Sequence, residues 1–187
     1  MFAMIADKKT ALSGVAVFVL VELFNIISAW MNGDLLSGNP APVLIFSYLC
    51  VSIFEETVFR ILPVRFFVAR LSSKRDEVLL ILTTSAAFGL FHLVNLFSGA
   101  SFSYTVLQII FASCIGAFFC VLFLRTGSPL LIVVLHFAHD VITGFYTPEL
   151  DRGIIYSGEV MFSEIVVVLS QAVVFLWFAV CWMRRER

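Results

Sequence analysis

Residues 43–60 of the chain read VLIFSYLCVSIFEETVFR. The run up to Phe54 is almost entirely apolar, and it leads directly into two adjacent acidic residues, Glu55 and Glu56, with Arg60 close behind. Charged side chains at the end of an apolar run are costly in lipid unless they are paired or hydrated. Each of these three residues therefore marks a candidate functional group inside a membrane-embedded helix.

The composition indicates that lipid, rather than water, surrounds most of the chain. The 187 residues are 61% hydrophobic and 13% charged, with a mean hydropathy of +1.04, whereas soluble domains are about half apolar and about a quarter charged. The formal net charge of -1 gives no basic surface for nucleic acid. We therefore expect the lipid bilayer as a partner, and no nucleic acid.

Apolar stretches of spanning length recur along the whole chain. A bilayer core of about 30 Å needs about 20 mostly apolar residues per helix. Six stretches approach or meet this length: 11–31, 42 to beyond 56, 78–97, 104–124, 129–145 and 162–183. Pro63 would bend or end the second helix. The sequence predicts an all-α, polytopic membrane helix bundle of about six transmembrane helices, forming one domain over residues 1–187 with its motif core at 43–146.

The distribution of lysine and arginine predicts the orientation. One side of a six-pass arrangement collects most of the basic residues: Lys8, Lys9, Arg65, Arg70, Lys74, Arg75, Arg125, Arg184, Arg185 and Arg187. The opposite loops contain a single basic residue, Arg152. Because cytoplasmic loops carry the excess of Lys and Arg, we expect both termini in the cytoplasm. The small size favours the plasma membrane of a prokaryote.

Two helices carry polar residues at one-turn spacing. Glu56 and Arg60 stand at i and i+4, where a carboxylate and a guanidinium can pair. Glu55 is rotated by about 100° around the helix and has no such local partner. A carboxylate without a partner can act as a general base. The local geometry thus predicts a structural Glu56 beside a free Glu55.

The three histidines of the chain lie within spanning segments as well. His92 lies deep in the third segment, and the fifth segment carries His136, His139 and Asp140. His136 and Asp140 also stand one turn apart, so both can point into the bundle. We expect these groups and Glu55 to share a water-filled cavity between mid-bilayer and the cytoplasmic side.

Three motifs in order resemble one family of membrane enzymes. Residues 55–60 match EExxxR, residues 88–92 match FxxxH, and residues 136–140 match HxxxN/D, while residues 126–129, TGSP, lead into the last motif. This pattern resembles the CPBP family of glutamate-dependent intramembrane proteases, which includes the CAAX prenyl endopeptidases and the bacterial Abi and bacteriocin-processing proteins. The resemblance implies a peptidase with a membrane-associated peptide or protein as its substrate and no cofactor, although a metal is left open.

The resemblance also implies a role for each motif residue. Glu55 and His92 would activate a water molecule, and His136 with Asp140 would stabilise the oxyanion of the tetrahedral intermediate. Glu56, Arg60 and Phe88 would support these groups without touching the substrate. We expect the same of His139, which lies outside the motif. Asp140 departs from the more usual Asn, and an ionised aspartate cannot donate a hydrogen bond to an oxyanion. It must therefore be protonated, or orient a neighbouring histidine.

Other readings of the same residues stay open. The histidines and Glu55 are also potential metal ligands, which allows a metal-dependent membrane hydrolase, although no HExxH motif is present. Buried Glu, His and Asp side chains also mark proton relays. A non-enzymatic immunity or regulatory membrane protein is the third alternative. Glu22 and Glu164 belong to no motif, and we expect each to meet a polar neighbour or the membrane interface.

Overall fold

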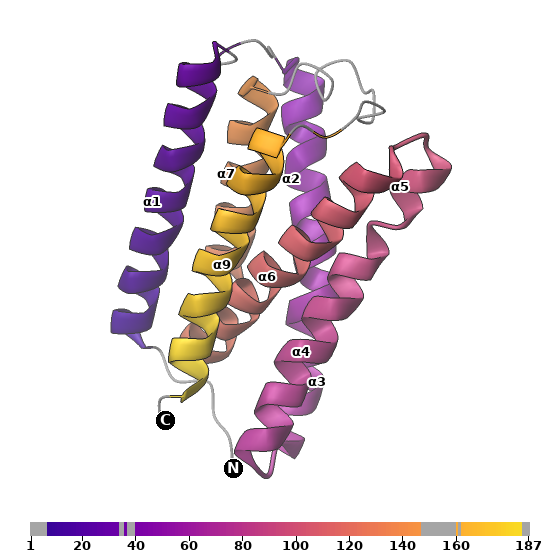
Figure 1. Cartoon of the computed structure of the whole chain (residues 1–187). Helices are drawn as coiled ribbons and strands as arrows, with labels where there is room; N and C mark the ends of the chain where they lie inside the picture. Colours follow the sequence, from indigo (N-terminus) through magenta and orange to yellow (C-terminus); the bar gives the residue numbers. More distant parts are fainter. Residues whose placement is uncertain (1–6, 34–35, 37–39, 147–159, 161, 185–187) are drawn as a thin grey trace.

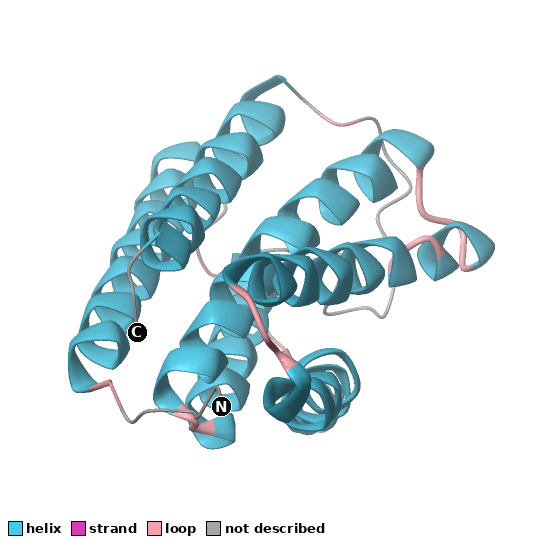
Figure 2. Cartoon of the chain, turned by 90° about the horizontal axis from the view of Figure 1, so that it is seen from below, coloured by secondary structure: helices cyan, strands magenta, loops and turns pink. Residues whose placement is uncertain are grey.

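The described part of the chain is entirely helical. The structure, a computed structural model, describes residues 7–33, 36, 40–146, 160 and 162–184, and Figure 2 shows helices and loops in these ranges but no strand. Six helical runs are long and apolar enough to cross a membrane: Lys8–Asn32, Pro42–Arg70, Lys74–Phe97, Phe102–Thr126, Pro129–Tyr146 and Phe162–Arg184. The predicted all-α bundle with six spans is confirmed.

Four spans are single helices and two are built from shorter pieces. The single helices are α1 (Lys8–Asn32), α6 (Phe102–Thr126), α7 (Pro129–Tyr146) and α9 (Phe162–Arg184). The second span consists of α2 (Pro42–Glu56), the π-helix η1 (Thr57–Ile61), α3 (Leu62–Phe67) and the 3-10 helix η2 (Val68–Arg70), and the third of α4 (Lys74–Phe91) and α5 (Val94–Phe97). Figure 1 shows that α1 begins and α9 ends at the same end of the bundle.

Arg125 ties several helix termini together at that end. Its Nη2 donates to the carbonyl of Trp182 on α9 at 2.9 Å and lies 3.7 Å from Oε1 of Glu77 on α4. Its own carbonyl accepts from the N–H of Asp7, which caps α1, at 3.1 Å. Lys74 also pairs with Glu77 at 2.9 Å, so described basic residues of the predicted cytoplasmic side gather here. Arg152, Arg185 and Arg187 lie outside the described residues.

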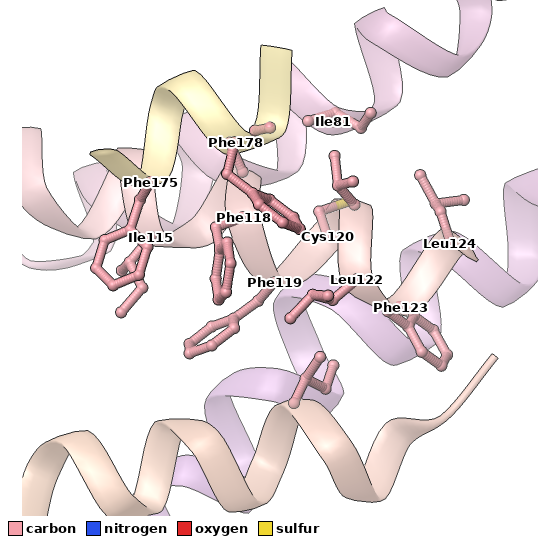
Figure 3. Packing of buried hydrophobic residues seen from close by; sticks show 14 of the residues in the cluster. Ile81, Ile115, Phe118, Phe119, Cys120, Leu122, Phe123, Leu124, Phe175 and Phe178 are labelled. Atoms are coloured by element: carbon pink, nitrogen blue, oxygen red, sulfur yellow. The ribbon is translucent and has the colours of Figure 1, made fainter. Parts of the chain in front are cut away.

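α6 forms the centre of the packing. Phe118, Phe119 and Phe123 on this helix are fully buried, and the rings of Phe118 and Phe175 lie 4.8 Å apart. Figure 3 shows Phe118 of α6 beside Phe175 and Phe178 of α9, whereas Phe119 and Phe123 lie on the side of α6 away from α9. Helix association in lipid depends on such close packing, because lipid tails are as apolar as the side chains themselves.

Small residues bring α4 and α6 together. A side chain at Gly89 would place its Cβ 2.7 Å from the carbonyl oxygen of Ile109, and one at Gly116 would lie 3.5 Å from Cα of Ser85. Backbones can approach this closely only where no side chain intervenes. The four-residue spacing of Ala112, Gly116 and Cys120 is typical of close helix packing, and Gly116 lies at such a contact with α4.

Pro63 does not end the second span. The N–H of Leu62 donates five residues back to the carbonyl of Thr57, as a π-helix requires. Pro63 has no N–H to donate, and a π-helical turn is a common way to accommodate an interrupted α-helical hydrogen-bond pattern. The helical run therefore continues through Pro63 to Arg70.

A sharp turn connects α6 to α7 and sets where α7 begins. Gly127 has a φ of 66° and ends α6 in the left-handed conformation that favours glycine. Pro129 is the first residue of α7, a position where the missing N–H costs nothing. The N–H of Leu131 donates to the Ser128 hydroxyl at 3.2 Å, which caps the new helix. The TGSP segment thus aims α7 back into the bundle.

Candidate active site

His136 lies at the centre of the acidic groups. Its Nδ1 lies 2.7 Å from Oε1 of Glu56, whereas its Nε2 lies 3.5 Å from Oε2 of Glu55 and 3.7 Å from Oδ1 of Asp140. The imidazole is buried, and it stacks on the Phe119 ring at 5.7 Å. One histidine on α7 therefore contacts both members of the glutamate pair on α2, each with a different ring nitrogen.

Glu56 and Arg60 form a buried ion pair. Arg60 Nη1 donates to Glu56 Oε1 at 3.1 Å, and both side chains are fully buried. The guanidinium carbon also lies 3.8 Å from the centroid of the Phe88 ring, a cation–π contact. The predicted pairing of Glu56 with Arg60 is confirmed. The 2.7 Å contact of Glu56 with His136 was not foreseen, and it makes Glu56 the group that orients this imidazole.

Glu55 is buried but less constrained. Its side chain is 11% exposed, against 0% for Glu56, and its approach to His136 at 3.5 Å is an ion-pair distance rather than a hydrogen bond. Among the described interactions, no residue of α2 donates a hydrogen bond to the Glu55 carboxylate. The carboxylate is therefore available to a water molecule or a substrate in a way that Glu56 is not.

His92 occupies the break between α4 and α5. It caps the C-terminus of α4, and its Nδ1 lies 3.0 Å from the Phe88 carbonyl oxygen. A carbonyl only accepts, so Nδ1 carries the proton and Nε2 of the neutral ring keeps a lone pair. The Phe88 ring meets both His92, at 5.0 Å, and His136, at 6.0 Å, edge to face. Phe88 thus separates and orients the two histidines.

Ser52 is a polar neighbour of the site that the motifs did not indicate. Its hydroxyl oxygen lies 3.2 Å from Oδ2 of Asp140, and the hydroxyl donates to the Tyr48 carbonyl at 2.7 Å. Ser52 precedes Glu55 and Glu56 by three and four residues, so the three share one face of α2. That spacing within an otherwise apolar run was the available signal.

His139 turns toward another helix. Its Nδ1 lies 2.8 Å from Oε1 of Glu22 on α1, and its ring stacks on Phe111 at 5.3 Å. The expectation that Glu22 meets a polar neighbour is confirmed. Glu164 lies in the first turn of α9, the last span. His139 itself does not contact the Glu55–His136 group in the described interactions.

The same residues can be tested as a metal site. Among the described residues, no three His, Cys, Asp or Glu side chains converge closely enough to hold a metal ion. His136 directs Nδ1 to Glu56, and His92 directs Nδ1 to a carbonyl. Nδ1 of each ring therefore has a hydrogen-bond partner in the protein. A measurement of metal content is the test of the metal-dependent alternative.

Comparison with known families decides the classification. A family model described as type II CAAX prenyl endopeptidase Rce1-like matches residues 37–142, more than half of the chain. The chain belongs to this family. The match includes all three motifs, so the resemblance to the CAAX protease group is confirmed, and the Rce1-like chain is placed among membrane peptidases. Comparisons with curated proteins and with solved structures gave no match.

Proposed function

We propose that this Rce1-like protein is an intramembrane endopeptidase that hydrolyses a peptide bond of a membrane-associated peptide or protein. Glu55 and His92 activate the attacking water, and His136, with Asp140 beside it, stabilises the oxyanion. The observation that carries the proposal is the position of His136, whose Nδ1 is held by Glu56 at 2.7 Å while its Nε2 faces Glu55 and Asp140.

Water activation needs a base that is close to the site and free to accept a proton. Glu55 has a carboxylate without a hydrogen bond in the described interactions, and Nε2 of neutral His92 keeps its lone pair because Nδ1 faces the Phe88 carbonyl. One of them takes the water proton as the water oxygen bonds to the carbonyl carbon. The same proton then passes to the amide nitrogen as the C–N bond breaks.

Oxyanion stabilisation needs donors that are fixed before the reaction. Glu56 accepts from Nδ1 of His136, so Nε2 can donate only when the imidazole is doubly protonated. Three carboxyl groups surround this ring within 3.7 Å and offset the positive charge. Asp140 can donate beside it when it is protonated on Oδ1, since its Oδ2 accepts from the Ser52 hydroxyl.

The family description directs the choice of substrate. CAAX prenyl endopeptidases are named for a lipidated C-terminal motif, and a prenyl chain would hold such a peptide at the membrane surface. We therefore place prenylated C-terminal CAAX peptides first among the substrates to test. An unprenylated peptide of the same sequence and a membrane-anchored leader peptide are the comparisons.

The test is cleavage of these peptides by the purified protein in lipid vesicles. Glu55→Gln and His92→Ala should each lower kcat by about 100-fold or more, since general acid–base groups contribute about 10²–10⁴-fold. Both variants should remain folded at the assay temperature. Glu77→Gln is the control, because it alters a buried, ion-paired carboxylate at the far end of α4. Full activity in Glu55→Gln would remove that residue from the mechanism.

The same preparation separates the alternatives. Stoichiometric tightly bound zinc that is lost in His136→Ala would favour the metal-dependent hydrolase. Proton flux across the vesicle membrane without cleavage of any peptide would favour the relay. Binding of a membrane partner by both wild type and Glu55→Gln, again without cleavage, would favour the immunity or regulatory role.

A further inference from the structure

A second polar cluster lies beside the candidate active site. Oε1 of Glu22 lies 2.8 Å from Nδ1 of His139, and Oε2 of Glu22 accepts from Nδ2 of Asn25 at 3.1 Å. Oδ1 of Asn25 accepts in turn from Nε2 of Gln171. Glu22, Asn25 and Gln171 are 3%, 4% and 6% exposed. The cluster thus joins α1, α7 and α9 within the membrane-spanning part of the bundle.

The hydrogen bonds of this cluster converge on one carboxylate. Gln171 donates to Asn25, and Asn25 donates to Glu22. Nδ1 of His139 supplies the second donor, so both Glu22 oxygens are satisfied. A buried carboxylate is tolerated in an apolar environment only when its oxygens are paired in this way. The cluster therefore holds the Glu22 carboxyl group against His139.

Helix α7 is consequently anchored from two sides. His136 reaches Glu56 on α2 at 2.7 Å, and His139 reaches Glu22 on α1 at 2.8 Å. Residues three apart on an α-helix point about 60° apart around its axis. A rotation of α7 would therefore lengthen at least one of the two contacts. Asp140 directly follows His139, so its approach to Ser52 depends on the same rotation.

We propose that Glu22 is a positioning residue for the reaction. By holding His139, it fixes the rotation of α7 at which Nε2 of His136 faces Glu55 and Asp140. The catalytic consequence rests on the proposed function. Glu22, Asn25 and Gln171 all lie outside the matched residues 37–142, so α1 and α9 contribute to the site although the family match does not include them.

The test uses nitrogen NMR of the three histidines, which do not need a substrate. The chain contains only three histidines, so selective ¹⁵N-histidine labelling in micelles gives a spectrum that can be assigned by single substitutions. Glu22→Gln should shift the signals of His139 and also those of His136, which it does not contact. Glu77→Gln, an equally buried carboxylate in another cluster, should leave the His136 signals unchanged.

The enzymatic test is a split between kcat and KM. Glu22→Gln should lower kcat by about 10- to 100-fold, the cost of misplacing catalytic groups by about 1 Å, with KM little changed. Asn25→Ala, which removes one donor to Glu22 and leaves the His139 contact in place, should act in the same direction but less. This milder variant carries the test if Glu22→Gln does not fold.

The outcomes separate this inference from the proposed function. Unmoved His136 signals in both Glu22→Gln and Asn25→Ala would overturn the coupling between the clusters. Shifted signals with unchanged kcat would overturn the catalytic consequence. The third outcome is a shift of the His136 signals in the variants together with a wild-type protein that cleaves none of the peptides. It would support the structural coupling and count against the proposed peptidase function.

Discussion

Glu56 and His136 join α2 to α7 through a 2.7 Å contact between Oε1 and Nδ1. The same oxygen accepts from Arg60 at 3.1 Å, so a single buried carboxylate both neutralises a cation and orients an imidazole. Glu55, the preceding residue, contacts the opposite nitrogen of that imidazole at 3.5 Å. The adjacent glutamates therefore differ in kind, and their substitution should affect different properties of the protein.

Glu56→Gln should mainly lower stability. Removing one partner of a fully buried ion pair leaves an uncompensated charge, which costs about 3–5 kcal/mol. In Glu56→Gln this uncompensated charge is that of the Arg60 guanidinium. Glu55→Gln should change the unfolding free energy far less, because Glu55 has no hydrogen bond to lose in the described interactions. Reversible unfolding in mixed micelles measures both. Equal losses of stability in the two variants would contradict the assigned difference.

Contacts within one helix were predictable, and contacts between helices were not. The Glu56–Arg60 pair follows from i,i+4 spacing alone. The His136–Glu56 and His139–Glu22 contacts connect residues 80 and 117 positions apart. Their existence depends on how α7 is rotated against α1 and α2, which sequence periodicity does not specify. The motifs located these groups on the chain without indicating which would meet.

The spans themselves were predictable because lipid imposes a strong constraint on length and polarity. The second span shows the limit of that constraint. A proline within a helical run predicts a bend or an end, but the π-helical turn at Thr57–Ile61 absorbs the interruption and the run continues to Arg70. The packing around a proline decides whether the helix ends there or continues through a π-helical turn. On either side of Pro63, the buried Arg60 and Val64 side chains face the bundle.

The cap of α1 should make stability pH-dependent. The Thr10 hydroxyl, with backbone N–H groups of Thr10 and Lys9, lowers the pKa of Asp7 below its ordinary value of 3.8. A lowered pKa in the folded state means that the carboxylate stabilises the fold above pH 3.8 and loses this effect as the pH falls through the folded pKa. Asp7→Ala should lower the unfolding free energy by about 1 kcal/mol at neutral pH.

Thermal unfolding followed by circular dichroism between pH 3 and pH 7 measures this effect of Asp7. The difference between wild type and Asp7→Ala should narrow below pH 3.8. Asp7→Asn, which keeps a capping oxygen without a charge, is the control and should show a smaller loss at neutral pH. A difference that stays constant over the whole range would show that the charge of Asp7 has no part in the cap.

The orientation predicted from the basic residues can be checked by labelling single cysteines. Ser72 is exposed between η2 and α4, and Ser98 is exposed after α5, near the opposite end of the same span. In a background without the four native cysteines, Ser72→Cys should react with an impermeant thiol reagent only after cell lysis, and Ser98→Cys should react in intact cells. The reverse pattern would place both termini outside.

Gly116 leaves the space that the Arg60 guanidinium occupies. A Cβ at this position would lie 2.5 Å from Nη2 of Arg60 and 3.3 Å from the Phe88 ring. Gly116→Ala should therefore displace the guanidinium and lower the unfolding free energy by about 1–3 kcal/mol, the usual cost of overpacking. In an Arg60→Lys background the clash with Nη2 is absent, so the further cost of Gly116→Ala should be clearly smaller. Unfolding measurements on the two single variants and the double variant give this coupling, and strictly additive costs would show that Gly116 and Arg60 do not interact.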